Sequence, residues 1–236
     1  MSESPRAWEV VLHHLEARLL SGDLGPGDHL PPERALATEL GVGRSSVREA
    51  VRVLDVLGLV RTQTGSGPHA GAIIIATPSG GMSALLRLQV AAKGFAVADI
   101  VKTRVMLESA IVAGLAEGIH DLEPATTLLN AMDSDELSPA EFLALDARFH
   151  VALAEASGNH VVTAMMAGLR NSIESYVVLG VPSISDWPAE VRQLRTEHRN
   201  ILSAINKGDA AAASTAIHEH ITGYYAATNL TEQDHS

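Results

Sequence analysis

Residues 30–67, LPPERALATELGVGRSSVREAVRVLDVLGLVRTQTGSG, decide the fold of the N-terminal part. Pro31 and Pro32 predict the start of a helix, because proline suits the first helical turn and disrupts later ones. Gly41 predicts its end, since a residue without a Cβ easily adopts a left-handed turn. A second helix follows after three or four residues, which is the spacing of a helix-turn-helix.

The second helix carries polar residues suited to DNA at its start. Arginine side chains match guanine edges and phosphates, and serine hydroxyls can reach phosphate oxygens. Two strand-like runs, 59–63 and 72–75, surround a glycine-rich tip at 64–67 and predict a hairpin. The alternative is a small helical hairpin with solvated arginines, and the following hairpin favours DNA binding over it. The residues in question are Arg44, Ser45, Ser46 and Arg48.

This arrangement resembles the winged helix-turn-helix of the GntR family of transcription regulators, over about residues 8–76. The matching segments are residues 30–34 (LPPER), 41–50 (GVGRSSVREA) and 57–60 (LGLV), with Gly65 and Gly67. Transferred position by position, the resemblance implies DNA contacts from Arg34, Arg44, Ser45, Ser46, Arg48, Thr64 and Gly65.

Gly43 departs from the family pattern, which usually has serine or threonine before the recognition helix. Glycine is a weaker N-cap by a few tenths of a kcal/mol, and it removes a hydroxyl that could hold a phosphate. Ser46 and Glu49 also have the spacing of a capping box. This spacing leaves open a later helix start.

Composition and charge limit the other possibilities. The chain has 236 residues, is 46% hydrophobic and lacks cysteine. It contains no apolar run near the ~20 residues of a membrane span and no leader-like N-terminus, so a cytoplasmic location is expected. The formal charge is −11, yet residues 1–70 carry only −2 of it. Five arginines between Arg34 and Arg61 would supply a local DNA-binding patch.

The expected fold is mainly α. It comprises a winged helix-turn-helix domain at 1–76, a linker at 77–82, an all-helical antiparallel bundle at 83–229 and a tail at 230–236. Breakers such as Gly158 and Pro188 separate the predicted helices of the bundle. These are residues 82–93, 96–117, 121–132, 139–157, 159–179, 188–206 and 209–228.

Polar residues interrupt the apolar faces of three of these helices. Asp146 and His150 are four residues apart and share one face, while His198 and His220 each lie on an apolar stripe. A lone histidine is more often a hydrogen-bonded core residue, but these four form a plausible divalent-metal set. His218 is an alternative to His220 as a ligand. Residues two apart on a helix point to roughly opposite faces, so only one of the two can point inward.

The C-terminal part resembles the FCD effector domain of the FadR-type branch of GntR regulators, over about residues 80–228. The matching segments are 104–108 (RVMLE), 146–150 (DARFH), 156–159 (ASGN), 197–201 (EHRNI) and 220–221 (HI). In metal-binding members an aspartate and three histidines hold a divalent cation. The resemblance assigns these roles to Asp146, His150, His198 and His220, and so favours His220 over His218. Zinc is the first expectation, with nickel, manganese or iron as alternatives.

Arg104 and Glu108 also lie on an apolar stripe. One interpretation is a buried ion pair with a purely structural role. The resemblance implies instead that Arg104 helps to bind an effector carboxylate close to the metal, a task that suits a guanidinium fork.

The expected function is transcription regulation. We expect a homodimer, a repressor rather than an activator, that binds a palindromic operator and responds to a small organic acid. One alternative is a metal-dependent hydrolase or lyase fused to a DNA-binding module, although no clear general base stands at motif spacing. Another is a regulator whose metal is only structural. The chain is not expected to be an enzyme.

Overall fold

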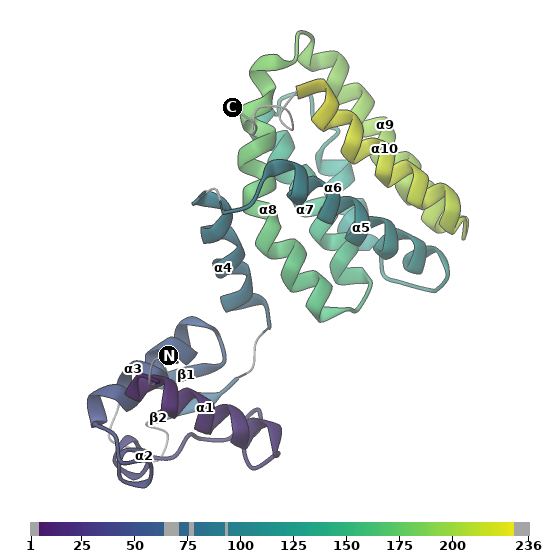
Figure 1. The fold of residues 1–236 in the computed structure, drawn as a ribbon. Coiled ribbons are helices and arrows are strands. Elements are labelled where there is room, and N and C mark those ends of the chain that lie inside the picture. The colour runs from purple at the N-terminus through teal and green to yellow at the C-terminus, as the bar shows by residue number, and fades with distance from the viewer. Residues whose placement is uncertain (1–4, 64–70, 76–77, 93, 229–236) are drawn as a thin grey trace. The chain divides into compact units, whose positions relative to one another are not determined.

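The computed structural model describes residues 5–63, 71–75, 78–92 and 94–228. It divides into two compact units, residues 1–82 and 83–236 (Figure 1). The mainly helical fold class predicted from the sequence is confirmed.

The N-terminal unit is a three-helix cluster with a two-stranded hairpin. Strand β1 pairs antiparallel with β2, and Val60 lies opposite Ile74. One small core joins these elements, with Val11 of the first helix, Leu36 of the second and Val47 of the third fully buried. The elements are α1 (Ala7–Leu20), α2 (Glu33–Leu40), α3 (Arg44–Val56), β1 (Val60–Gln63) and β2 (Gly71–Ile74).

The turn between α2 and α3 forms as its glycines predict. Gly41 has a φ of 64° in the left-handed region, and its backbone N–H donates to Ala37. Helix α3 begins at Arg44 with Gly43 as its N-cap, and no side chain caps it. The later start suggested by Ser46 and Glu49 is therefore wrong, because Gly43 already has the extended backbone of a cap residue.

Helix α4 (Pro78–Ala91) begins inside the segment predicted as an irregular linker, residues 77–82. Residues 78–82 are helical, since Pro78 suits a first helical turn despite the glycines that follow. A Cβ on Gly81 would lie 2.2 Å from the carbonyl oxygen of Leu57, so this close backbone approach requires glycine.

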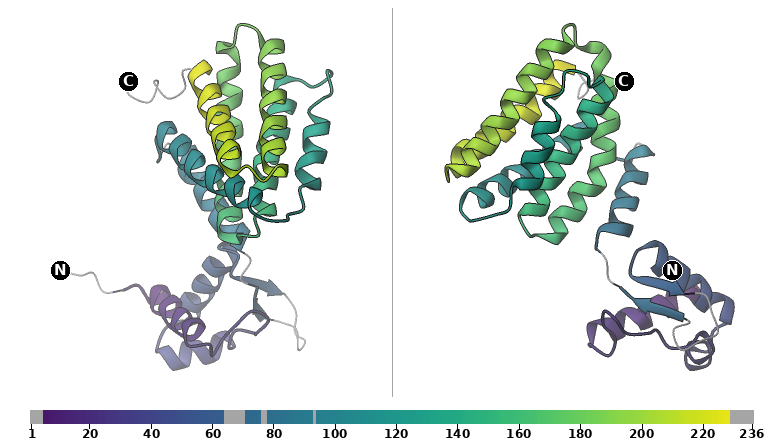
Figure 2. Two further views of the ribbon diagram at one scale, coloured as in Figure 1. Left: turned by 90° about the vertical axis from the view of Figure 1, so that its right-hand side faces the viewer. Right: turned by 180° about the vertical axis from the view of Figure 1, so that it is seen from behind.

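The C-terminal unit is a bundle in which α10 packs against α5 and α9, while α7 packs against α6 and α8 (Figure 2). Its large core is aliphatic with a few aromatic rings. None of the described helices is long and apolar enough to cross a membrane. The helices are α5 (Val97–Ala116), α6 (Glu123–Ala131), α7 (Pro139–Ala156), α8 (His160–Gly180), α9 (Trp187–Asn206) and α10 (Ala210–Thr228), with a 3₁₀ turn at Val181–Ser183.

Helix α7 has clear start and stop signals. Ser138 and Glu141 form a capping box, and Pro139 occupies the first turn. Gly158, with a φ of 71°, follows its C-terminus. Phe142 and Phe149 are buried on its inner face. The ends and the apolar face together fix how this helix presents its polar residues to the core.

Candidate metal centre and nucleic-acid interface

The predicted DNA-contacting side chains lie on the surface of the N-terminal unit. Arg34, Arg44, Ser45 and Arg48 are exposed, and Ser46 is half-buried. Arg48 lies 3.7 Å from Glu33, an exposed contact that water screens and DNA can displace. Thr64 and Gly65, the predicted wing contacts, lie outside the described residues.

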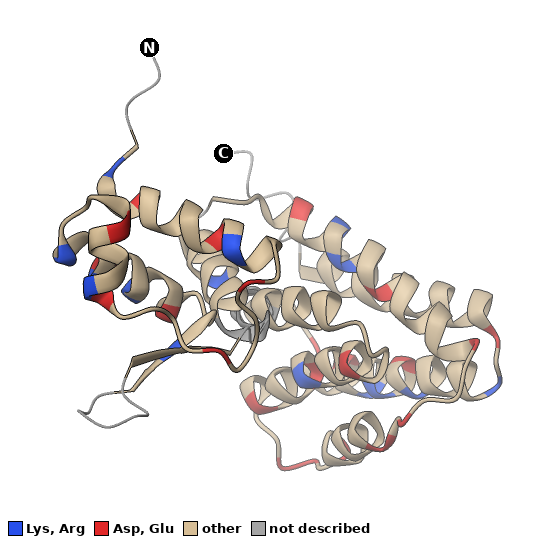
Figure 3. Ribbon diagram, turned by 90° about the horizontal axis from the view of Figure 1, so that it is seen from below, with Lys and Arg blue, Asp and Glu red and all other residues tan. Residues whose placement is uncertain are grey.

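Charged residues are mixed along several helices of both units. Acidic and basic positions occur together on α2, α5 and α9, whereas α6 and α10 carry only acidic ones (Figure 3). The excess of acidic over basic residues is small in residues 1–70 and large in the remainder. The exposed arginines of α2 and α3 therefore form the local basic group of the N-terminal unit.

The four predicted metal ligands meet in the core of the C-terminal unit. Helix α7 supplies Asp146 and His150, α9 supplies His198, and α10 supplies His220. All four are buried, with 0–5% of their surface exposed. His218 is exposed, which agrees with the choice of His220. Buried polar side chains such as these four need partners, because burial without them is costly.

The distances within this cluster are short. The Nε2 atoms of His150 and His220 lie 3.2 Å apart. Asp146 Oδ1 lies 2.9 Å from His198 Nε2 and 3.8 Å from His220 Nε2. One potential ligand atom from each of the four residues lies within 4.8 Å of the others.

Two carboxylates outside the cluster orient two of the imidazoles. Glu108 Oε2 lies 2.5 Å from His150 Nδ1, and Glu197 Oε2 lies 2.8 Å from His220 Nδ1. A carboxylate at Nδ1 favours the tautomer with the proton there, which leaves a lone pair on Nε2. Among the residues that the structure describes, both ring nitrogens of His198 are buried without a hydrogen-bond partner. The short contact between Glu108 Oε2 and His150 Nδ1 also lacks the geometry of a hydrogen bond, unlike that between Glu197 and His220.

These donors fit a divalent metal ion. With protons on Nδ1, the facing nitrogens of His150 and His220 both present lone pairs, which repel unless a cation or proton lies between them. Zinc–nitrogen bonds of about 2.0–2.1 Å place tetrahedral donors roughly 3.4 Å apart. The separations of the potential ligand atoms start at 2.9 Å and do not exceed 4.8 Å, a range that includes this value. Imidazole nitrogens and a carboxylate oxygen also suit nickel, manganese or iron.

The protonation states also suit a metal site. Burial lowers the pKa of His198 to about 4, so the imidazole is neutral near pH 7. Burial opposes ionisation of Asp146, but the short contact with His198 and the other neighbouring histidines outweigh it and lower the pKa of that carboxyl. A neutral imidazole and an ionised carboxylate are the forms that bind metal.

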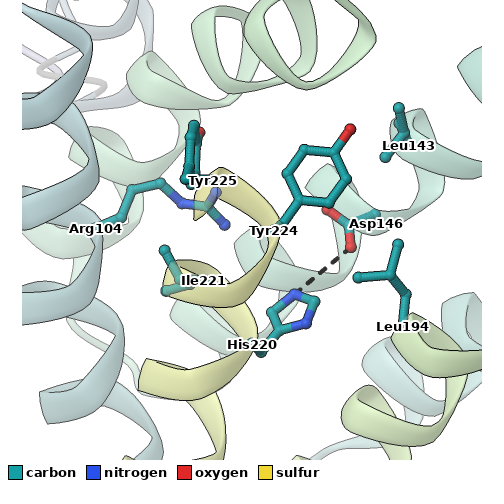
Figure 4. Close-up of a pocket in the computed structure, with 8 residues that line it drawn as sticks. All are labelled: Arg104, Leu143, Asp146, Leu194, His220, Ile221, Tyr224 and Tyr225. Atoms are coloured by element: carbon teal, nitrogen blue, oxygen red, sulfur yellow. Dashed lines mark ion pairs between the residues drawn. The ribbon is translucent and has the colours of Figure 1, made fainter. Parts of the chain in front are cut away.

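A narrow cavity of about 10 Å³, room for about one water molecule, adjoins the cluster. Asp146 and His220 form part of its wall, and Arg104 of α5 directs its guanidinium toward it (Figure 4). The remaining lining residues are Leu143, Leu194, Ile221, Tyr224 and Tyr225. Apolar side chains and the cation of Arg104 are the groups that recognise a small anion with an apolar part, and the cavity would have to widen to admit one.

Arg104 and Glu108 form the buried ion pair predicted from their spacing. Arg104 Nε donates to Glu108 Oε1 at 2.8 Å, and both residues are at most 3% exposed. Burial would raise the pKa of Glu108, but Arg104 and then His150 outweigh it and lower this pKa to about 2. Glu108 also raises the pKa of Arg104 against the effect of burial. Both groups are therefore charged.

Sequence reasoning missed two contacts of this site. Glu108 was expected to pair with Arg104 but not with His150, and Glu197 was not assigned a role. Glu197 reaches His220 from another helix, so no spacing along one helix could have indicated the contact. The one available signal for Glu108 was an acidic residue on an apolar helical stripe.

Comparisons with known proteins agree with this architecture. Residues 8–69 match the family described as bacterial regulatory proteins, gntR family, and residues 99–223 match the FCD domain. The chain is 31% identical to the HTH-type transcriptional regulator LutR of Bacillus subtilis, over 86% of this chain and 92% of LutR. It is 31% identical to the HTH-type transcriptional repressor NanR of Klebsiella aerogenes, over 90% of this chain and 82% of NanR.

A solved structure gives the same result. The Streptococcus agalactiae GntR structure superposes with a TM-score of 0.63 at 27% identity, covering 91% of this chain and 97% of that chain. The curated relatives are regulators, and none of those named here is described as an enzyme. The chain therefore belongs to the GntR family of bacterial transcription regulators and carries an FCD effector domain.

Proposed function

We propose that this regulator is a homodimeric repressor that releases a palindromic operator when a small carboxylate binds beside a divalent metal in its FCD domain. The observation that supports this most strongly is the buried convergence of Asp146, His150, His198 and His220 next to a pocket that contains Arg104. The location is cytoplasmic in this proposal, and the domain assignment is that of residues 1–76 and 83–229.

The DNA-binding half of the proposal rests on the exposed side chains at the start of α3. Arg44, Ser45 and Arg48 are exposed, with Ser46 half-buried beside them. In this proposal the side chains at the start of α3 enter the major groove of DNA. Arg34, and Thr64 and Gly65 of the wing, contact the DNA backbone. A two-fold dimer presents two such helices to two half-sites. Relatives described as repressors support repression.

The effector half rests on the chemistry of the pocket. A bound metal supplies positive charge on one side, and Arg104 supplies it on the other. The Nε atom of Arg104 donates to Glu108, and the guanidinium also interacts with the side chain of Tyr225. In this proposal an incoming carboxylate binds the terminal nitrogens of the fork. The leucines and isoleucine of the wall would cover the rest of a small organic acid. Such binding regulates transcription only if the acid has different affinities for the DNA-bound and free states.

The first experiment is thermal unfolding of the full-length protein with a panel of organic acids, with and without a chelator. A ligand at about 100 times its Kd stabilises by about 2.7 kcal/mol, which gives a readable shift. We expect one class of acid to stabilise only the metal-loaded protein. The same acid should release an operator isolated by selection from random duplexes, read as fluorescence anisotropy.

Variants make this experiment specific. Arg104→Gln should abolish the stabilisation by the acid, whereas Arg192→Gln, which removes an exposed arginine of α9, should preserve it. Stabilisation that ignores the chelator would place the acid away from the metal. A chelator that lowers the melting temperature while no acid acts would show that the metal is structural.

A further inference from the structure

Glu108 occupies a position that no other carboxylate of the described chain shares. One oxygen accepts from Arg104 Nε at 2.8 Å, and the other lies 2.5 Å from Nδ1 of the metal-ligand candidate His150. The side chain is 3% exposed, so water does not screen either contact. A single buried carboxylate therefore divides its charge between the guanidinium of the pocket and an imidazole of the cluster.

We propose that Glu108 is a positioning residue that couples the two halves of the site, so that an anion on Arg104 strengthens the hold of His150 on the metal. This inference rests on the proposed function, because it needs both a metal and a carboxylate ligand. It adds that the metal and the acid bind cooperatively, and that part of this cooperativity depends on the side chain of Glu108.

The direction follows from charge. Without a ligand, Glu108 is the anion that balances Arg104, and its electron density is drawn toward the guanidinium. A carboxylate on the terminal nitrogens of Arg104 takes over part of that balance. Glu108 then interacts more strongly with the Nδ1 proton of His150, which makes Nε2 a better electron donor. By thermodynamic reciprocity, the metal must raise the affinity for the acid by the same factor.

Glu197 provides a matched control within the same site. It lies 2.8 Å from Nδ1 of His220 in a hydrogen bond, whereas Glu108 lies 2.5 Å from Nδ1 of His150 in an ion-pair contact without hydrogen-bond geometry. The other oxygen of Glu197 accepts from Gln193 Nε2 at 2.8 Å rather than from an arginine. Both carboxylates orient an imidazole of the cluster. Only Glu108 also contacts the proposed anion-binding guanidinium.

The test measures zinc affinity by competition with a chromophoric chelator. The full-length wild type, Glu108→Gln and Glu197→Gln are compared in the absence and presence of acetate, and then of any acid that stabilises the wild type. Both variants should bind zinc about 10- to 100-fold more weakly, the usual cost of losing an outer partner. The acid should tighten zinc binding by the same factor in the wild type and in Glu197→Gln. In Glu108→Gln that factor should shrink at least threefold.

The outcomes separate this inference from the proposed function. An equal acid-dependent factor in all three proteins would show that coupling occurs by direct contact of acid and metal, and would overturn the role of Glu108 alone. Absence of any acid effect on zinc binding in the wild type would overturn the proposed function and this inference with it.

Nuclear magnetic resonance gives a readout that a purely structural role would not change, and it does not depend on folding of Glu108→Gln. In zinc-loaded wild type with ¹⁵N-labelled histidine, the acid should shift the Nδ1 proton of His150 more than that of His220. Glu197→Gln assigns the His220 signal, because that variant alters its acceptor. Equal shifts of the two signals would contradict a path through Glu108.

Discussion

The two units place their functional side chains in opposite environments. In the N-terminal unit the described DNA-contact candidates are exposed apart from the half-buried Ser46, and most lie within one turn and a half of α3. In the C-terminal unit the proposed ligands are buried and come from three helices. Exposed side chains can be replaced with little effect on folding, because water solvates what remains. Buried polar groups are coupled to stability, because each must keep its partner.

The largest expected effect tests this coupling at the cluster. Asp146→Asn removes the charge that faces all three imidazoles, and should weaken zinc binding more than 100-fold. Chelator competition measures this loss. Operator affinity in the absence of the acid should change far less. Retention of tight zinc binding in this variant would contradict the proposed metal site.

The second-largest expected effect is a loss of stability of the C-terminal unit at acidic pH, caused by its buried ionisable groups. The pKa of about 4 for His198 in the folded protein lies below the ~6.5 of a solvated histidine, so protonation favours the unfolded chain. With a chelator present, the free energy of unfolding should fall by at most about 3.5 kcal/mol as pH drops from about 6.5 to 4. Asp146 and Glu108, with lowered pKa values, extend the loss below pH 4.5. Urea unfolding at several pH values measures it, and a flat profile would argue against a buried neutral His198.

Arg44→Ala should affect DNA binding without affecting the core. Loss of a specific arginine contact costs about 1–3 kcal/mol in operator affinity and reduces the dependence on salt. Zinc affinity and melting temperature should remain those of the wild type. Arg192→Ala, which removes an exposed arginine of the other unit, serves as the control. A large fall in melting temperature for Arg44→Ala would contradict the view that the DNA-contact candidates of the N-terminal unit contribute little to stability.

Ser138→Ala should produce a smaller effect, limited to stability. Ser138 Oγ accepts from the backbone N–H of Glu141 at the start of α7, the helix that carries Asp146 and His150. Loss of such a cap costs about 1 kcal/mol. Calorimetry should show a slightly lower melting temperature, with zinc affinity within about twofold. A strong loss of zinc affinity would mean that the cap sets the cluster geometry as well.

Gly43→Ser should have the smallest effect, of opposite sign. The backbone at Gly43 has a φ of −69°, and a Cβ there would meet only Ser45 Oγ at 3.4 Å. Serine should therefore cap α3 and stabilise the protein by a few tenths of a kcal/mol. Its hydroxyl could also reach a phosphate, so operator affinity should rise slightly. A lower melting temperature would show that the turn depends on glycine.

The sequence by itself determined the winged helix-turn-helix, the helical second domain and the identities of the proposed ligands. Pro31, Gly41 and the arginines of α3 act within one short stretch, and local signals of this kind depend on backbone and helix geometry alone. Helical spacing placed Asp146 with His150, and Arg104 with Glu108, on common faces. The resemblance then chose His220 over the exposed His218.

Tertiary structure alone decided how these groups meet. Contacts between helices, such as Glu108 with His150 and Glu197 with His220, join residues 42 and 23 positions apart in the chain. No periodicity along one helix encodes such distances, because they depend on how α5, α7, α9 and α10 pack. The position at which α4 begins also depends on tertiary structure, because a glycine-rich segment has a low intrinsic helix propensity. The proposed ligands could be predicted from the sequence, whereas the carboxylates next to them could be found only from the packing of the bundle.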